Sequence, residues 1–204
     1  MWYNLERKTG GFYMWGRNTT ENIAVIDTET NWENDVMSIG VVIAKSDNFA
    51  PICAKYYIIE SAVSVGGMYS DVLYFKDKSR MEFVSMNGAT ENLCNIFSKY
   101  NVKKLFAYNA KFDATHLTGL ENFQWFDIMR IAAYCQYNKK IPFGTPCCKT
   151  GRLKSNYGVE PIMRMLSGDD TYGEVHNALC DAIDELKIME LLEIPISQYG
   201  VARI

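Results

Sequence analysis

Three short apolar segments follow one another closely near the start of the chain, and this spacing is what most restricts the fold. The segments span residues 22–27, 36–45 and 52–60, and each has the length and composition of a buried strand. Polar residues at 31–35 and 46–51 separate them and are typical of turns. The sequence therefore predicts a meander of three antiparallel strands.

After the third strand the pattern changes to strands that alternate with helices. Apolar residues near helical spacing predict a helix over 82–100, followed by a strand at 103–108. The remaining elements are predicted in the same way: a short helix after Asn109, a strand at 123–127, and helices at 128–137, 154–166 and 178–192. Residues 138–151 are rich in proline and glycine and predict a substrate-facing loop. This order of elements is typical of an α/β domain.

Length and composition limit the class of protein. A chain of 204 residues suits one α/β domain, which we place at residues 22–204 behind an N-terminal arm or flap at residues 1–21. No apolar run near the start of the domain approaches the roughly 20 residues of a membrane span, and the N-terminus lacks the apolar core of a signal peptide. The six cysteines show no spacing typical of a zinc site. We therefore expect a cytoplasmic protein with reduced thiols and no membrane segment.

Charge is distributed unevenly along the chain. The net charge of −3 argues against a protein that coats nucleic acid through bulk electrostatics. Residues 138–156 hold five cations and no acid, whereas residues 160–193 hold nine acids against two cations. The first segment suits phosphates, and its candidate substrate contacts are Lys149, Arg152 and Lys154. The second segment suits metal ions.

Two carboxylates stand at the end of the first predicted strand, in the sequence Asp27-Thr28-Glu29. In an extended chain, side chains two residues apart leave the same face of a sheet, so both carboxylates point one way. Buried like charges at that separation repel, and a divalent cation removes the cost. Oxygen ligands of this kind suit Mg²⁺ or Mn²⁺ rather than zinc. The alternative, a strand-end turn with two solvated acids, stays open for this pair taken alone.

A further acid follows the strand predicted at 103–108. Asn109 and Asp113 lie four residues apart where that strand meets a short helix. Asn109 is placed to cap the helix, and Asp113 lies on the same helix face one turn later. Asp113 is a candidate metal ligand, with a partner of the helix dipole as the alternative. For Asn109 a structural role is favoured over a catalytic one.

A histidine and an acid stand at the start of the helix predicted over 178–192. His176 and Asp181 converge only if His176 lies in the loop before the helix, with Asn177 as the N-cap. Asp181 and Glu185 repel each other one turn apart, and a metal ion at Asp181 would relieve part of that repulsion. Histidine side chains titrate near neutral pH, so His176 is a candidate general base, with a polar surface histidine as the plainer alternative.

Taken together, these motifs resemble those of the DEDDh 3′-to-5′ exonucleases, a group built on an RNase H-like fold. The resemblance rests on residues 26–30 (Ile-Asp-Thr-Glu-Thr), 107–113 (Ala-Tyr-Asn-Ala-Lys-Phe-Asp), 126–130 (Phe-Asp-Ile-Met-Arg) and 176–182 (His-Asn-Ala-Leu-Cys-Asp-Ala). It spans roughly residues 22–193. It implies a five-stranded mixed sheet flanked by helices, in which parallel strands join the antiparallel meander.

The resemblance also implies an activity. Asp27, Glu29 and Asp181 would bind one divalent cation, Mg²⁺ or Mn²⁺, and Asp27 with a water-mediated Asp113 would bind a second. His176 would take the proton from the attacking water, and a 5′ nucleotide would leave the 3′ end of single-stranded DNA or RNA. The preference between DNA and RNA stays open, as does the choice between repair, proofreading and RNA trimming.

Residues within or beside these motifs are candidates for holding the substrate. Thr28, Thr30 and Asn109 are expected to contact it, and Trp32 and Phe112 can stack on terminal bases. An aromatic residue beside a strand more often belongs to the core, which is the alternative for the last two.

The chain departs from the proofreading pattern at Asn31-Trp32, where those enzymes often have Thr-Gly. It stops soon after the last predicted helix, so no polymerase-binding tail is expected, and a homodimer is left open. The competing hypothesis is a nucleic-acid-binding or assembly module that keeps the fold without hydrolysis. Because all five catalytic positions are present, we favour the enzyme.

Overall fold

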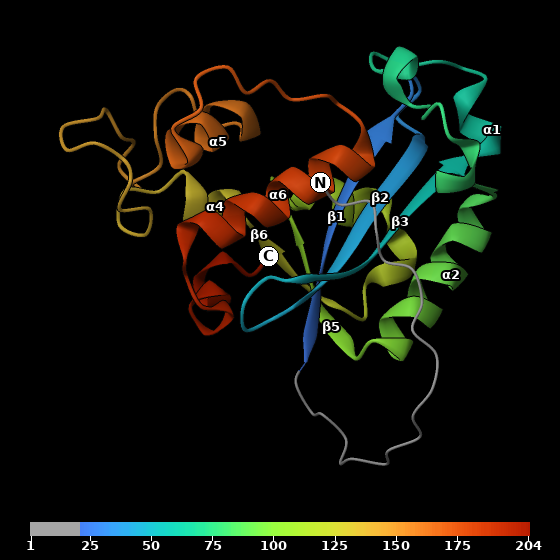
Figure 1. The fold of residues 1–204 in the computed structure, drawn as a ribbon, viewed down its shortest axis with the longest axis horizontal. Coiled ribbons are helices and arrows are strands. Elements are labelled where there is room, and N and C mark those ends of the chain that lie inside the picture. The colour runs from blue at the N-terminus through green and yellow to red at the C-terminus, as the bar shows by residue number, and fades with distance from the viewer. Residues whose placement is uncertain (1–20) are drawn as a thin grey trace.

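A mixed β-sheet with helices on both faces forms the body of the protein in the computed structural model, which describes residues 21–204 (Figure 1). β1 (Asn22–Thr30), β2 (Val36–Lys45) and β3 (Pro51–Ile59) form the predicted antiparallel meander. β5 (Val102–Ala107) pairs in parallel with β1, and β6 (Gln124–Asp127) pairs in parallel with β5. The predicted α/β class is confirmed, whereas the arm predicted at 1–21 lies outside the described residues except for Glu21.

The sheet has six strands instead of the expected five, because Glu82–Val84 forms a short edge strand, β4. It pairs in parallel with β3, and the sheet order is β4-β3-β2-β1-β5-β6. The helix predicted over 82–100 is therefore shorter and spans Met86–Lys99, as α2. Ser85 fixes its start, since the Ser85 hydroxyl oxygen accepts a hydrogen bond from the Gly88 N–H at 3.1 Å.

The residues of β1 alternate between two hydrophobic cores, one on each face of the sheet. Ile23 and Val25 pack with α4, α5 and α6, and Ala24 and Ile26 pack with α1 and α2. The helices are α1 (Glu60–Val63), α3 (Lys111–His116), α4 (Met129–Ala132), α5 (Val159–Ser167) and α6 (Ala178–Leu192). Figure 1 shows α6 lying across one face of the strands, with α2 beyond their other side. Short 3-10 turns lie at Ser70–Val72, Lys78–Arg80, Thr118–Leu120 and Ile196–Ala202.

Two other predicted helices are also shorter than expected. The helix predicted over 128–137 ends at Ala132, because Tyr134 forms an isolated antiparallel bridge with Arg152 just beyond it. The helix predicted over 154–166 begins only at Val159, after Asn156 adopts a left-handed backbone with φ of 56°. Residues 138–151 form no helix or strand, as predicted. Within residues 21–204, none of the helices has the length and apolar character needed to cross a membrane.

Candidate active site

β1 supplies two of the predicted metal ligands. The strand continues to Thr30, three residues past its predicted end, so Asp27 and Glu29 lie inside it. They continue the alternate row of residues that begins with Ile23 and Val25. Both carboxylates therefore leave the sheet on the face that α6 covers.

α6 brings its first turn very close to the sheet at Gly40, the residue paired with Asp27 on β2. A side-chain carbon at position 40 would lie 2.1 Å from the Ala178 carbonyl oxygen, so this approach requires glycine. Asn177 is the N-cap, as predicted, and its side-chain oxygen accepts hydrogen bonds from two backbone N–H groups of the first turn at 3.2 and 3.3 Å. Asp181, one turn into the helix, is thereby brought over the carboxylates of β1.

Asp113 comes from α3 and is almost fully buried. Its Oδ1 accepts a hydrogen bond from the Thr28 hydroxyl at 2.8 Å. The expected cap at Asn109 is wrong, because Ala110 holds the capping position and makes no side-chain cap bond. Asn109 instead has a left-handed backbone, with φ of 61°, and its N–H donates to Asp127 Oδ1 at 3.0 Å. This arrangement turns the chain between β5 and α3 towards the acids.

A cleft of about 370 Å³ joins these segments. Its lining includes the five predicted catalytic residues, Asp27, Glu29, Asp113, His176 and Asp181. It also includes five of the predicted substrate contacts, Thr28, Thr30, Trp32, Asn109 and Phe112. Among residues 21–204, no lysine or arginine borders the cleft, so no side chain of these two types neutralises its acids.

The acids of the cleft fit a divalent cation. One carboxylate oxygen from each of Asp27, Glu29 and Asp181 lies within 4.8 Å of the others. Asp27 Oδ2 and Asp181 Oδ1 are buried, and neither has a hydrogen-bond partner within the described part of the chain. Buried polar atoms without partners are costly, and a cation would satisfy both. The all-oxygen donor set suits Mg²⁺ or Mn²⁺.

Burial is the first cause of the raised carboxyl pKa values in the cleft. It holds the pKa of Asp27 well above the usual range, and the Asp113 and Glu185 carboxylates raise it further. Burial, followed by the charge of Asp181, raises the pKa of Glu29 to about 8. Burial also raises the pKa of Asp181 to about 8 and that of Asp113 to about 7, although the Thr28 hydroxyl opposes the change at Asp113.

His176 lies in the loop directly before α6, with a left-handed backbone and φ of 58°. Its ring stacks on the Tyr69 ring, with 4.1 Å between the ring centres and 17° between the planes. One of its ring nitrogens also lies within 4.8 Å of carboxylate oxygens of Glu174 and Asp181. The imidazole is thus held on one side by an aromatic ring and stands beside the acid cluster.

Several residues at or beside the cleft were not among the predicted site residues, and Glu185, Glu174, Met68 and Tyr69 are examples. Glu185 is fully buried, and its position four residues after Asp181 was a signal that it shares the same helix face. Glu174 stands two residues before His176 with no spacing that marks it. Met68 and Tyr69 belong to the segment between α1 and β4, which has no periodic pattern from which their position could be predicted.

The mouth of the cleft carries exposed apolar side chains. Trp32 and Met68 are each 68% exposed, and Phe112 is 38% exposed. The Trp32 N–H donates to the Gly66 carbonyl oxygen at 3.0 Å, which links the turn after β1 to the segment that carries Met68. Exposed aromatic faces at an opening of this kind suit planar groups such as nucleobases.

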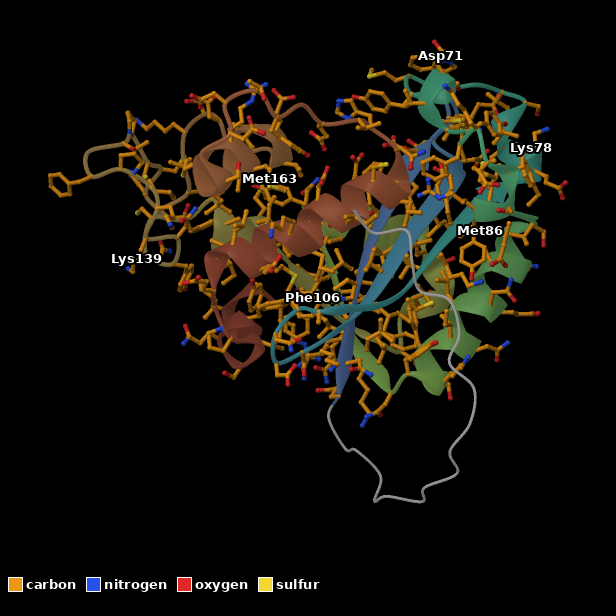
Figure 2. All side chains as sticks on the ribbon, viewed as in Figure 1. Asp71, Lys78, Met86, Phe106, Lys139 and Met163 are labelled. Carbon is orange, nitrogen blue, oxygen red and sulfur yellow. The ribbon has the colours of Figure 1, made fainter. Side chains whose placement is uncertain are left out.

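The three predicted cations do not border the cleft. Lys149 and Lys154 are exposed, and the Arg152 guanidinium lies 4.4 Å from the centre of the Tyr157 ring. The carbonyl oxygen of Tyr157 accepts a hydrogen bond from the hydroxyl of Tyr108, which does line the cleft. Arg152 is therefore connected to the cleft through two tyrosines. Figure 2 shows Lys139, in the same basic segment, on the opposite side of the molecule from Asp71.

Comparison with protein-family models and with curated proteins gives no match. Solved structures do match. The nuclease domain of 3′hExo, a DEDDh family member, bound to rAMP, has a TM-score of 0.59 and 14% identity over 92% of this chain and 96% of the other. A 3′-exonuclease described in the 3′-end-specific recognition of a histone mRNA stem-loop has a TM-score of 0.58 and 14% identity, and the match covers 87% of this chain and 65% of the other. Exonuclease X in complex with 5′-overhanging duplex DNA has a TM-score of 0.50 and 14% identity, and the match covers 83% of this chain and 90% of the other. The chain therefore has the RNase H-like fold of the DEDDh exonucleases.

Proposed function

We propose that the protein is a metal-dependent 3′-to-5′ exonuclease that hydrolyses phosphodiester bonds at single-stranded nucleic-acid 3′ ends and releases 5′ nucleotides. The observation that carries this proposal is the convergence of the five predicted catalytic residues in one cleft, although they come from three separate segments of the chain. The fold supports the same activity, since the matched structures are nucleases whose descriptions include rAMP, a DNA overhang and an RNA 3′ end.

The acids prepare the cleft for two divalent cations, Mg²⁺ or Mn²⁺. Asp27, Glu29 and Asp181 would hold one of them, and Asp27 with Asp113 would hold the other. The chemistry that such ions supply when bound is neutralisation of the phosphodiester charge and acidification of the attacking water. Thr28 contributes by fixing Asp113, because its hydroxyl donates to one of the two Asp113 oxygens.

His176 acts as the general base, accepting the proton of the attacking water at an imidazole nitrogen. Two features of the chain support this role. The stacked Tyr69 ring restricts rotation of the imidazole, and the left-handed backbone at His176 sets its direction immediately before α6. The base and the Asp181 ligand are therefore positioned by the same helix start.

The terminal nucleotide lies at the mouth of the cleft. Trp32 and Phe112 stack on bases there, which contributes about 1 to 3 kcal/mol per base and does not depend on the base sequence. Thr28, Thr30 and Asn109 line the same opening and contact the terminal nucleotide. The rest of the strand passes Tyr108 towards Lys149, Arg152 and Lys154, which bind its phosphates.

Two further points stay predictions from the sequence. The cytoplasmic location is the first of them. A homodimer rests on no feature of the described residues, and the size of the protein in solution, measured by light scattering, decides it.

The test of the proposed function is digestion of single-stranded DNA and RNA of one sequence, labelled at the 5′ end, with Mg²⁺, Mn²⁺ or EDTA. We expect a ladder that shortens from the 3′ end with either metal and no change with EDTA. A covalently closed circle of the same sequence should resist digestion, because it has no end. Cutting of the circle would identify an endonuclease, and binding without any cleavage would favour the nucleic-acid-binding module.

A further inference from the structure

We propose that the cleft holds an additional cation site, formed by Glu174, His176 and Asp181, that takes a transition-metal ion of the zinc type. A ring nitrogen of His176 and one carboxylate oxygen of each acid lie within 4.8 Å of one another. This set is different from the all-oxygen set of Asp27, Glu29 and Asp181, and the two sets share Asp181.

The donor atoms of the two sets suit different metals. One imidazole nitrogen with two carboxylate oxygens is a donor set that zinc accepts, with the fourth position left for water or another ligand. Mg²⁺ and Mn²⁺ favour oxygen donors, whereas imidazole suits zinc and its neighbours in the transition series. Two adjoining positions in one cleft therefore differ in the ion that each one prefers.

Asp181, which the two sets share, has a buried oxygen that points to a bound ligand. Its side chain is only 3% exposed and borders the cleft, yet its Oδ1 has no hydrogen-bond partner among residues 21–204. A carboxylate has two oxygens, so Asp181 can serve both sets of ligands. A metal ion bound at this site would give the buried oxygen the partner that it lacks.

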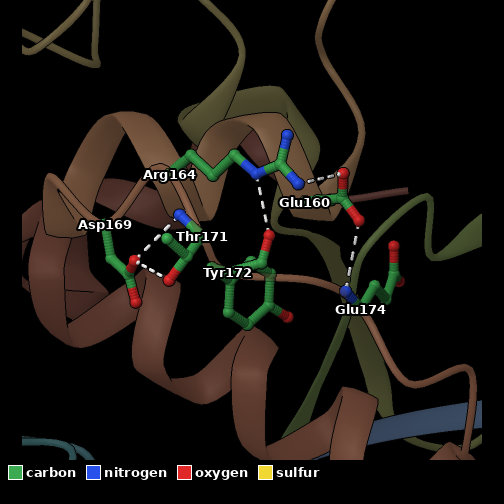
Figure 3. Close-up of polar contacts among 6 residues, drawn as sticks. All are labelled: Glu160, Arg164, Asp169, Thr171, Tyr172 and Glu174. Atoms are coloured by element: carbon green, nitrogen blue, oxygen red, sulfur yellow. Dashed lines mark hydrogen bonds and ion pairs between the residues drawn. The ribbon is translucent and has the colours of Figure 1, made fainter.

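The backbone that carries Glu174 is held in place by α5. Figure 3 shows that the Glu174 N–H donates to Glu160 Oε2, at 3.2 Å, and that Glu160 Oε1 pairs with the Arg164 guanidinium at 2.8 Å. Arg164 Nε also donates to the Tyr172 carbonyl oxygen at 2.8 Å, so the loop before α6 is fastened to α5 on both sides of residue 173. Ligands that are positioned before binding lose less conformational freedom when the ion arrives.

Occupation of this site has a consequence that rests on the proposed function. A zinc ion coordinated by His176 uses an imidazole lone pair, and the general base needs a lone pair to accept the proton of water. Zinc should therefore inhibit hydrolysis supported by Mg²⁺ without having to displace the ions of the all-oxygen set.

The direct test is calorimetric titration of ZnCl₂ into the full-length protein saturated with Mg²⁺. Loss of even an outer partner of a metal ligand typically lowers metal affinity about 10- to 100-fold, so Glu174→Gln and His176→Ala should each weaken zinc binding at least about tenfold. Asp27→Asn should keep the zinc affinity, since Asp27 belongs only to the all-oxygen set.

Glu33→Gln is the charge-matched control, because Glu33 is exposed and follows Trp32 at the mouth of the cleft. Unchanged thermal unfolding confirms that each variant is folded.

Two results would overturn the proposal: zinc affinity that survives both Glu174→Gln and His176→Ala, or zinc affinity that only Asp27→Asn removes. The activity assay provides a second readout, in which Glu174→Gln should need at least about tenfold more zinc for half-inhibition, relative to its own zinc-free rate. Zinc binding at these residues in a protein without nuclease activity would keep this site and overturn the proposed function. Nuclease activity without zinc binding would overturn this site and keep the proposed function.

Discussion

Asp27 Oδ2 is buried among other acids, and at the scale of single residues this burial sets the main cost of the site. Removal from water raises its pKa first, and the charges of Asp113, Glu185, Asp181 and Glu29 add to the effect. In the absence of metal, the folded protein therefore favours protonated carboxyls. A bound cation reverses that preference, since it stabilises the ionised form.

Metal-free protein should consequently lose stability as the pH rises. The carboxyls of an unfolded chain titrate near pH 4, whereas burial raises the pKa of Glu29 and Asp181 to about 8. Because the folded state holds these protons more tightly than the unfolded state, stability falls as pH increases between those values. Thermal unfolding in EDTA should give a lower Tm at about pH 8 than at about pH 5, and Asp27→Asn should reduce the difference. An equal or higher Tm at about pH 8 would contradict this account.

Single substitutions also separate the ligands from the base. Asp27→Ala should abolish metal-dependent nucleotide release, because both proposed ions depend on Asp27. His176→Ala should lower the rate by about 100-fold or more while leaving metal binding by the all-oxygen set intact. The control is Asp47→Ala, an exposed acid in the turn between β2 and β3. Full activity of the Asp27 variant, measured by release of labelled nucleotide, would refute the site assignment.

Residue-level prediction succeeded where local geometry decides a position. The period of an extended strand places Asp27 and Glu29 on one face, and Asn177 marks the start of α6 and thereby the place of His176. Glu174 and Tyr69 could not be predicted in this way. Their positions depend on the path of loops fixed by tertiary contacts, such as the bond from the Glu174 N–H to Glu160.

At the scale of elements, the contact between α6 and β2 determines how the halves of the site meet. The first turn of α6 rests on Gly40, with no room for a side chain between the helix backbone and the strand. Asp181 and His176 move with this helix, and Asp27 lies on the strand next to Gly40. The separation of helix and strand thus sets the separation of the ligands.

Gly40→Ala should therefore destabilise the protein and disrupt the site together. A methyl group 2.1 Å from the Ala178 oxygen forces the helix away from the sheet, which we expect to lower the free energy of unfolding by about 3 kcal/mol or more. Gly88→Ala in α2 is the matched control, since its nearest neighbour would be 3.4 Å away, and it should be neutral or stabilising by about 0.5 to 1 kcal/mol. Urea unfolding measures both. Equal effects at the two positions would show that the close approach is not a constraint.

Element boundaries were predicted well where a local signal exists and poorly where a distant partner intervenes. β2 and α6 have the predicted bounds, with Asn177 as the cap of α6. The early end of α4 depends on Tyr134 pairing with Arg152, eighteen residues later, and no local pattern indicates such a bridge. The edge strand β4 was hidden for the same reason, because its three residues extend the sheet only by pairing with β3.

At the scale of the whole molecule, acids and cations occupy separate regions. The acids converge in the cleft, and the basic segment at 138–156 is connected to it through Tyr157 and Tyr108. The proposed strand path, from the cleft past Tyr108 to the basic segment, follows this connection. The family resemblance implied a mixed sheet, but the order of its strands was not predicted, since pairing between distant strands leaves no local signal in the sequence.

Removing Lys149, Arg152 and Lys154 together should weaken strand binding and flatten its salt dependence. Each neutralised phosphate on a single strand contributes about 0.7 to the slope of log affinity against log salt, so loss of three contacts should reduce its magnitude by about 2. The charge-matched control replaces Lys45, Lys99 and Lys103, which are exposed and lie at the other end of the sheet. Fluorescence anisotropy of a labelled oligonucleotide at several salt concentrations measures the slope, and an unchanged slope would remove this segment from the strand path.

Gly40 and the cleft acids meet different structural requirements, which gives a way to interpret related sequences. Glycine at position 40 is required wherever the helix rests on the strand, whatever the protein binds, whereas Asp27 is required only for chemistry that uses cations. A relative that keeps the glycine and has lost the aspartate should still fold and have no hydrolytic activity. One that has lost the glycine should have repacked the helix, and its acids, even if all are present, would no longer meet.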